Sequence, residues 1–257
     1  MQPGSYLPVA VAAVDLAAEI LRSCEPAVVM SKGDRDMVSD VDIEIERAVR
    51  AYLRSHSPEV GFLGEEEGNV HCGGGPFWVL DPVDGTANFV KGIPLYAVSL
   101  ALVNGAEPVL GVIDVPADGC RYTAAAGRGA WCGDARIGVR LADAVVTVGD
   151  YAVGEQAGAR NQVRLAVTGR LAARVQRVRM LGSAALDLAW LAHGRTDAAV
   201  IFGNKPWDTA AGVILVREAG GLVVDADGSR HTLSSASTVA ASAGLLDQVL
   251  ELIAEAA

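Results

Sequence analysis

The sequence predicts a globular protein of mixed α and β structure with a large hydrophobic core. The chain has 257 residues and 51% of them are hydrophobic, so a substantial core is possible and disorder is not expected. Apolar residues recur at helical spacing in residues 5–24, whereas short β-rich runs alternate with Gly, Pro and Asp in residues 95–131. We therefore expect helices packed against sheets, in one large domain or in two small ones that share a core.

The composition also limits the classes of partner and the compartment. The formal net charge is −10, which opposes binding to nucleic acid or to an anionic membrane. The cysteines Cys24, Cys72, Cys120 and Cys132 form no C-x-x-C pair and have no His cluster beside them, so neither a zinc site nor a disulfide framework is expected. Four free thiols are typical of a reducing cytoplasm, where we expect the protein to act.

The first apolar segment could be mistaken for a targeting sequence. Residues 7–21 are rich in Ala, Val and Leu, but Asp15 and Glu19 interrupt them and no Lys or Arg precedes Arg22. A signal peptide needs a basic start and an uninterrupted apolar centre. No apolar stretch is expected to approach the ~20 residues of a membrane span.

The remaining elements follow from periodicity and from turn residues. Residues 31–37 are polar and predict a mobile surface loop, and residues 138–146 mark a change of pattern, which divides the chain into subdomains 1–142 and 143–257. The expected helices cover residues 5–24, 40–55, 159–174, 186–191 and 210–219, and the expected strands cover 60–63, 77–80, 145–148 and, as antiparallel neighbours, the runs within 95–115 and 120–131.

The richest stretch for chemistry is residues 76–89, PFWVLDPVDGTANF. A buried strand delivers Asp81 at its end, a turn follows with Asp84 and Gly85, and a short helix could begin at Thr86. Two carboxylates at a strand end suit hard cations, and the free N–H groups of a helix start suit an oxyanion. Metal and phosphate together indicate phosphoryl chemistry.

This stretch resembles the first signature of the inositol monophosphatase family, within the Mg²⁺-dependent, lithium-sensitive type of phosphatase superfamily. Three further segments resemble that family in order along the chain. VSDVD at 38–42 places a functional acid at Asp42, with Lys32 as the loop lysine, and GEE at 64–66 supplies Glu65 and Glu66. WDTAAG at 207–212 with EAGG at 218–221 resembles the second signature and supplies Asp208.

The resemblance implies an α/β (α+β) layered sandwich of alternating helix and sheet layers, like that of inositol monophosphatase and fructose bisphosphatase, and a homodimer. It also implies hydrolysis of a phosphate monoester on a small metabolite with two or three Mg²⁺ per active site, for which four carboxylates roughly neutralise two ions. The implied roles are metal binding by Glu65, Asp81, Asp84, Asp208 and the Val83 carbonyl, catalysis by Asp42 and Thr86 on the attacking water together with Glu65, phosphate binding by Gly85 and Thr86, substrate contact by Ser183, Ala184 and position 201, and support by Glu66 and Lys32.

The substrate is less defined than the reaction. Inositol-specific members carry a glutamate seven residues before the second-signature aspartate, and here that position is Ile201. Ile201 either lines the pocket and weakens recognition of inositol hydroxyls, or packs within a strand while another group takes over. Fructose 1,6-bisphosphate, histidinol phosphate and 3′-phosphoadenosine 5′-phosphate stay open as substrates. A regulatory protein without the reaction is a further alternative, although every ligand position is filled and no basic surface is expected.

Overall fold

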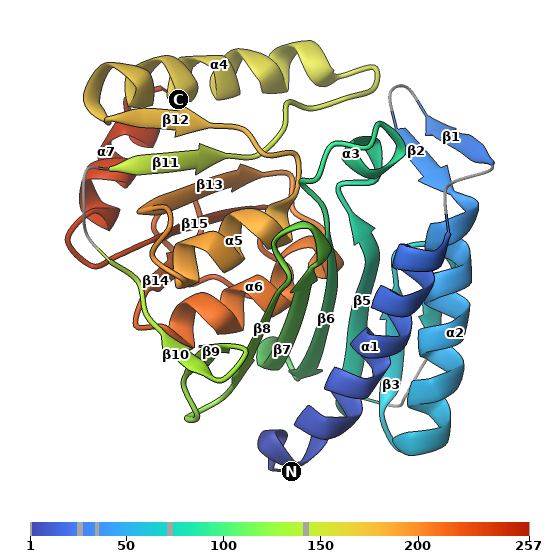
Figure 1. Ribbon diagram of the computed structural model, residues 1–257. Coiled ribbons are helices and arrows are strands. Elements are labelled where there is room, and N and C mark those ends of the chain that lie inside the picture. Colours follow the sequence, from blue (N-terminus) through green and yellow to red (C-terminus); the bar gives the residue numbers. More distant parts are fainter. Residues whose placement is uncertain (1, 25–27, 34–35, 71–73, 141–143, 257) are drawn as a thin grey trace.

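The computed structural model describes residues 2–24, 28–33, 36–70, 74–140 and 144–256. Helices and sheets alternate through the molecule (Figure 1). Helices α1 (Leu7–Ser23) and α2 (Asp40–His56) cover one face of a large sheet, and α5 (Ala184–Ala192) and α6 (Pro206–Glu218) cover its other face. A second sheet follows, with α4 (Ala157–Arg174) and α7 (Leu246–Ala254) on its outer side. The expected sandwich of alternating layers is confirmed.

The large sheet is formed by strands from the first part of the chain. All its neighbouring strands run antiparallel except β3 and β5, which are parallel. Its order is β10 (Ala135–Ile137), β9 (Ala130–Cys132), β8 (Cys120–Ala125), β7 (Glu107–Val115), β6 (Ala97–Asn104), β5 (Phe77–Asp84), β3 (Gly61–Gly64) and β4 (Asn69–Val70). The antiparallel strands predicted between residues 95 and 131 are therefore present.

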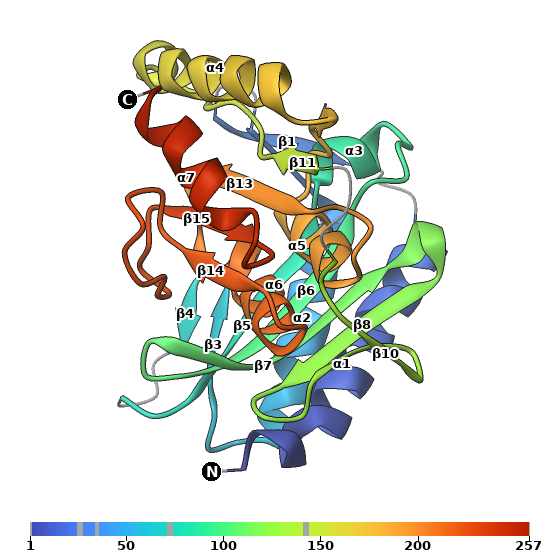
Figure 2. The same ribbon diagram turned by 90° about the vertical axis from the view of Figure 1, so that its left-hand side faces the viewer.

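The second sheet is smaller and mixed. Strand β11 is parallel to β12 and β13, whereas β15 is antiparallel to β13 and β14. The order is β12 (Arg177–Arg179), β11 (Val145–Val148), β13 (Ala198–Phe202), β15 (Ser237–Ala241) and β14 (Leu222–Val224). Figure 2 shows α4 and α7 side by side over the outside of this sheet.

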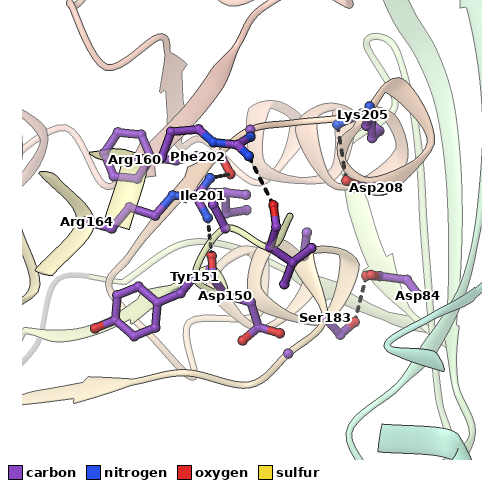
Figure 3. Close-up of a pocket in the computed structure, with 16 residues that line it drawn as sticks. Asp84, Asp150, Tyr151, Arg160, Arg164, Ser183, Ile201, Phe202, Lys205 and Asp208 are labelled. Carbon is purple, nitrogen blue, oxygen red and sulfur yellow. Dashed lines mark hydrogen bonds between the residues drawn. The ribbon is translucent and has the colours of Figure 1, made fainter. Parts of the chain in front are cut away.

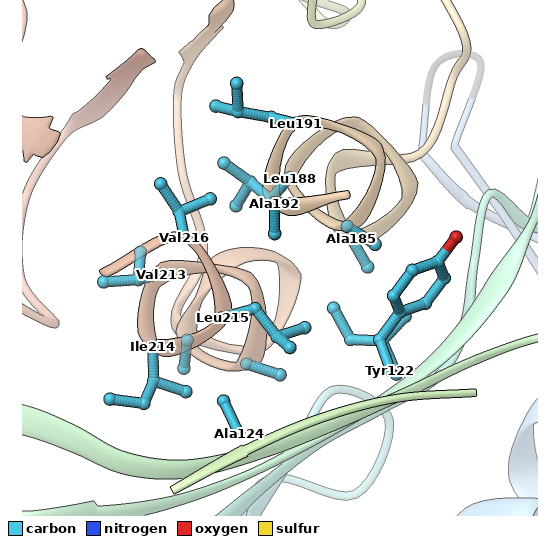
Figure 4. Packing of buried hydrophobic residues seen from close by; sticks show 14 of the residues in the cluster. Tyr122, Ala124, Ala185, Leu188, Leu191, Ala192, Val213, Ile214, Leu215 and Val216 are labelled. Carbon is cyan, nitrogen blue, oxygen red and sulfur yellow. The ribbon is translucent and has the colours of Figure 1, made fainter. Parts of the chain in front are cut away.

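The two central helices join the sheets through a tightly packed apolar layer (Figure 4). Leu188 and Leu191 of α5 and Val213 and Leu215 of α6 are fully buried there. A Cβ atom on Gly212 would lie 2.5 Å from the Cβ atom of Leu188, so only glycine permits this approach of the helices. The close packing fixes the start of α6, which carries Asp208, relative to the large sheet.

Helix α1 departs from one expectation. With the preceding 3₁₀ turn (Pro3–Tyr6), residues Pro3–Ser23 form a helix that is long and apolar enough to cross a membrane, although no such stretch was expected. One such helix near the N-terminus is weak support for a membrane span. Ala13, Val14 and Ala17 are fully buried and belong to the same core cluster as residues of α2, as in a core helix.

The polar segment at 31–37 is also different from the expectation of a loop. Strands β1 (Val29–Gly33) and β2 (Asp36–Ser39) pair as an antiparallel hairpin, with Met30 opposite Val38. Val38, which directly follows the polar run, is buried, so an apolar side chain of β2 anchors the hairpin. The predicted boundary within residues 138–146 overlaps residues 141–143, which lie outside the described part of the chain.

Candidate active site

The start of α2 holds the first candidate catalytic group. Ser39 caps the helix, and its backbone N–H donates to Asp42 Oδ2 at 3.1 Å. The other carboxylate oxygen, Asp42 Oδ1, lies 3.0 Å from Thr86 Oγ1. Asp42 is fully buried, and this burial raises its pKa despite the hydrogen bonds from Ser39 and Thr86. The helix start thus presents a carboxylate that is more basic than usual to the Thr86 hydroxyl.

Strand β5 carries Asp81 and Asp84 at its end. The pairing of β5 with β6 is irregular between these two residues, and such bulges re-aim side chains next to active sites. Asp81 is buried and accepts a hydrogen bond from the Val83 N–H at 3.1 Å, while the Val83 carbonyl oxygen lies 3.0 Å from Thr86 Oγ1. These hydrogen bonds link the end of β5, the turn that follows it and the Thr86 hydroxyl.

Gly85 makes the turn from β5 into the short helix α3 (Thr86–Val90). Its φ of 96° lies in the left-handed region, and a Cβ atom there would come within 2.9 Å of the Leu95 carbonyl oxygen. Asn88 then donates to the carbonyl oxygens of Leu95 and Leu181, at 2.7 and 2.8 Å. The first signature is thereby fastened to the loop that precedes α5.

Asp84 extends this connection to α5 itself. Its Oδ2 accepts hydrogen bonds from Ser183 Oγ at 2.7 Å and from the Ala185 N–H at 2.5 Å. Burial raises the pKa of Asp84 to about 6, in part against these hydrogen bonds, and Glu65 adds to the increase. The predicted substrate-contact segment at Ser183 and Ala184 therefore lies against a predicted metal ligand.

A buried glutamate, Glu46 of α2, shapes the acidic loop after β3. Its carboxylate accepts hydrogen bonds from the backbone N–H groups of Glu66 and Glu67, at 2.7 and 2.9 Å, and from Arg50 at 2.6 Å. A Cβ atom on Gly64 would overlap this carboxylate, so a side chain at position 64 would displace it from its hydrogen bonds. The fixed backbone of the loop directs Glu65 towards Asp81 and Asp84, whose pKa values it raises.

Asp208 reaches the site from the opposite layer. It stands at the third position of α6, where its Oδ2 accepts a hydrogen bond from the Lys205 N–H at 3.1 Å. Lys205 is the N-cap, and Pro206 begins the helix four residues before residue 210, where the sequence predicts its start. The pKa of Asp208 is raised well above the usual range by burial and then by Asp84 and Glu65.

The carboxylates of the site raise one another's pKa values. Burial and then the charges of Glu65, Asp84, Asp208 and Asp42 raise the pKa of Asp81 well above its usual range. Within the described ranges, no three such side chains converge closely enough to enclose an ion as they stand. Asp81, Asp84 and Asp208 each accept a hydrogen bond from a local N–H or O–H donor. An all-oxygen set of clustered carboxylates fits a hard divalent cation.

A pocket of about 330 Å³ opens from these acids (Figure 3). Asp84 and Asp208 line one side of it, and Ser183 and Ala184 line the adjoining wall. Ile201 of β13 also lines it, although its side chain is only 5% exposed. Ile201 is thus both packed in a strand and part of the pocket wall, and its effect on the recognition of inositol hydroxyls stays a prediction.

The predicted site residues do not all come together. Asp42, Thr86 and Val83 form one hydrogen-bonded group, and the acids around Asp81 form one electrostatic group. Glu66 contributes its N–H to Glu46, and Lys32 lies in β1 with a side chain outside the described residues. Roles in metal and substrate binding stay predictions for all of them.

Several pocket residues were missed from the sequence. Asp150 follows β11, and Arg160 and Arg164 lie on α4, and all three line the pocket. No motif marks them, since they resemble ordinary solvent-facing charges. Their spacing of four on a helix is the signal that could have placed both arginines on one face. Glu46 was missed because its role depends on a loop 20 residues away.

Comparison with known sequences decides the family. A sequence model of the inositol monophosphatase family matches residues 4–257. The chain belongs to the inositol monophosphatase family. This family consists of metal-dependent phosphoric monoester hydrolases, so the expected family, fold and enzyme class are confirmed.

Individual relatives agree with this assignment. The chain is 43% identical over 214 residues to an inositol-1-monophosphatase of Mesorhizobium japonicum, covering 81% of this chain and 79% of that protein. It is 34% identical over 231 residues to a fructose-1,6-bisphosphatase/inositol-1-monophosphatase of Thermotoga maritima, covering 87% and 84%. The crystal structure of the extragenic suppressor protein suhB from Bartonella henselae matches with a TM-score of 0.90 at 32% identity, covering 97% and 98%.

Proposed function

We propose that this inositol monophosphatase family member hydrolyses the phosphate monoester of a small metabolite with Mg²⁺ at the acid cluster. The observation that carries the proposal is the meeting of acids from both signatures, Asp84 on β5 and Asp208 on α6, at one pocket. Phosphate monoesters hydrolyse extremely slowly without catalysis, so the site must stabilise a large developing charge.

The acid cluster would hold the metal through Glu65, Asp81, Asp84 and Asp208, with the Val83 carbonyl beside them. Bound divalent ions supply positive charge to the phosphoryl oxygens and activate water for in-line attack. The number of ions, two or three, follows from the family resemblance. Their affinity should be high because the acids repel one another when no cation is bound.

Asp42 and Thr86 would handle the proton of the attacking water. The water oxygen forms a bond to phosphorus while the bond from phosphorus to the ester oxygen breaks, and the ester oxygen leaves as the alcohol after taking a proton from solvent. The water proton passes to Thr86 Oγ1, whose own proton moves to Asp42 Oδ1 across the 3.0 Å hydrogen bond. Burial raises the pKa of Asp42, which makes this carboxylate a stronger base than an exposed one.

Phosphate binding would use the backbone N–H groups at Gly85 and Thr86, where α3 starts. Free N–H groups at a helix start point outward and favour an anion. Ser183 and Ala184, at the start of α5, would contact the organic part of the substrate. We further propose a homodimer that acts in the cytoplasm, as the family resemblance and the cysteine content suggest.

The test is phosphate release from a panel of phosphorylated metabolites, with Mg²⁺ and with EDTA. The panel includes inositol 1-phosphate, glycerol 2-phosphate, fructose 1,6-bisphosphate, histidinol phosphate and 3′-phosphoadenosine 5′-phosphate. Release that depends on Mg²⁺ and stops in EDTA is expected for at least one ester. Absence of release from all of them at saturating Mg²⁺ would contradict the proposal.

A further inference from the structure

Two arginines face the pocket from the side opposite the acids. Arg160 and Arg164 lie four residues apart on α4, which places them on one helix face (Figure 3). In the part of the chain that the structure describes, neither of them forms an ion pair with a carboxylate. The pocket therefore has a cationic side that the protein does not neutralise at contact distance.

Both guanidinium groups are held in place by backbone oxygens. Arg164 donates to the carbonyl oxygens of Asp150 and Phe202, at 2.5 and 2.7 Å, and its guanidinium lies 6.0 Å from the centre of the Phe202 ring. Arg160 donates to the Val153 carbonyl oxygen at 3.1 Å. A guanidinium has five N–H donors, so each group keeps donors for a ligand.

The charges around the arginines favour an anion between them. Burial and the neighbouring charge of Arg160 lower the pKa of Arg164, as expected where two cations stand close together. The carboxylate of Asp150 attracts Arg164 from beyond ion-pair distance. At this end of the pocket two arginines thus face one acid, Asp150, whereas Asp84, Asp208 and Lys205 lie at the other end, in a chain whose net charge is −10. A bound anion would relieve the repulsion between the arginines.

Ile201 separates the two ends of the pocket. It lies between the arginines and the acids, and a Cβ atom on the neighbouring Gly149 would touch it at 3.3 Å (Figure 3). A glutamate at this position, as in inositol-specific relatives, would repel an anion held by the arginines. Isoleucine leaves an apolar wall that suits the carbon chain of a substrate.

We infer that the substrate carries a second anionic group, a phosphate or a carboxylate, which Arg160 and Arg164 bind while the scissile phosphate lies at the acid end. The inference rests on the proposed function and specifies its substrate class: a phosphorylated polyol or sugar with an anion at the other end of its carbon chain. Arginine suits this task because its planar fork binds phosphate or carboxylate through two hydrogen bonds. The volume of about 330 Å³ is at the lower end of small-molecule sites.

The experiment compares six-carbon substrates that differ only in the second group. Sorbitol 6-phosphate is the reference, sorbitol 1,6-bisphosphate tests a second phosphate, and 6-phosphogluconate tests a carboxylate. We expect kcat/KM with Mg²⁺ to be about tenfold higher for one or both of the substrates with a second anionic group than for the reference, after correction for the two phosphates of the bisphosphate. The arm with the larger ratio identifies the anion.

Variants then link the preference to α4. The preference is the ratio of kcat/KM for a substrate with a second anionic group to kcat/KM for the reference. Arg160→Gln should reduce this ratio about tenfold, and Arg160→Lys should retain part of the preference. Arg174→Gln is the matched control, since Arg174 is exposed on the same helix and does not line the pocket. The control should leave the ratio at its wild-type value.

The outcomes separate the inference from the proposed function. Hydrolysis of sorbitol 6-phosphate with no preference for either substrate that has a second anionic group overturns the inference and leaves the proposed function intact. A preference that Arg160→Gln and Arg174→Gln reduce equally overturns it as well. Failure to hydrolyse any phosphate ester overturns the proposed function and the inference with it.

Discussion

The acidic end of the pocket and its arginine end differ in how their side chains are held. At the acidic end, Asp42, Asp81 and Asp84 are bound by hydrogen bonds from neighbouring loops and helix starts. At the other end, Arg160 and Arg164 extend from an outer helix, and their hydrogen bonds are to backbone carbonyl oxygens. A reaction common to a family needs the rigid end, whereas the choice of substrate can change through long side chains on a surface helix.

The largest effect is expected from removing an acid at the rigid end. Asp84→Asn or Asp208→Asn should nearly abolish turnover, because each removes a charge that the cations require. Steady-state kcat at saturating Mg²⁺, with circular dichroism as the control for folding, is the measurement. Retention of more than about a tenth of kcat would show that the acid is no ligand and would weaken the contrast between the two ends.

The hydrogen-bonded pair at the same end should behave as one unit. Thr86→Ala and Asp42→Asn should each lower kcat by about a hundredfold with little change in KM, since both act on the same proton. The double variant should be barely slower than either single variant. Losses that multiply would mean that the 3.0 Å contact carries no proton between them.

Cation binding should stabilise the acidic end directly. At a concentration 100 times its Kd, a ligand of the folded state adds about 2.7 kcal/mol to the free energy of unfolding. The thermal midpoint of metal-free protein should therefore rise as Mg²⁺ is added, and rise much less in Asp81→Asn. The same response in both proteins would exclude Asp81 from the metal site.

The metal-free protein should also lose stability as the pH rises. The pKa of Asp84 is about 6 in the folded chain against 3.8 ordinarily, so the folded state binds more protons between these values. The free energy of unfolding therefore decreases as the pH rises through this window. Urea midpoints in EDTA should fall less steeply in Asp84→Asn than in wild type.

This comparison removes an opposing contribution. Burial lowers the pKa of His231 to about 4, so His231 makes stability increase with pH over part of the same range. Because His231 is present in both proteins, it cancels from the difference between their slopes, which reports Asp84 together with the increase that Asp84 causes in the pKa values of Asp81 and Asp208. Equal slopes would show that the carboxyl titrates normally.

Smaller effects are expected between the two ends. Ile201→Glu should raise kcat/KM for inositol 1-phosphate relative to glycerol 2-phosphate by about tenfold, because a carboxylate accepts hydrogen bonds from adjacent hydroxyls. The wild-type protein should discriminate weakly between the two esters. A wild-type preference of a hundredfold or more for inositol 1-phosphate would show that another group supplies this recognition.

The smallest effect should come from Asp150. Its exposed carboxylate repels an anion bound at the arginines. Asp150→Asn should therefore raise the preference for substrates with a second anionic group by about two- to threefold at low salt. The change should shrink in 0.5 M salt because exposed charges are screened. A decreased preference would mean that Asp150 holds Arg164 in its binding position.

The sequence predicts the acidic end well because its chemistry is local. Asp81, Asp84 and Thr86 lie within one strand and turn, and Asp208 lies within one helix start, so short motifs carry them. The position of Asp208 at the third residue of α6 is missed because Pro206 begins the helix four residues before the predicted start at residue 210.

Features that depend on distant partners are not predictable in this way. The β1–β2 hairpin depends on the buried Val38 beside a polar run, and part of the apolar surface of α1 is buried in the same core cluster as residues of α2. The role of Arg164 requires carbonyl oxygens from β13 and from the loop after β11. Neighbours far apart in sequence decide each of these.

Glu46 and Gly64 have a consequence for the evolution of this chain. The carboxylate of Glu46 fills the space that any side chain at position 64 would occupy. A larger residue at 64 therefore requires the Glu46 carboxylate to move away or position 46 to become smaller, and either change leaves two backbone N–H groups of the acidic loop without their acceptor. Neither position can change first without harm, so the two should be inherited as a pair, even though neither is expected to touch the substrate.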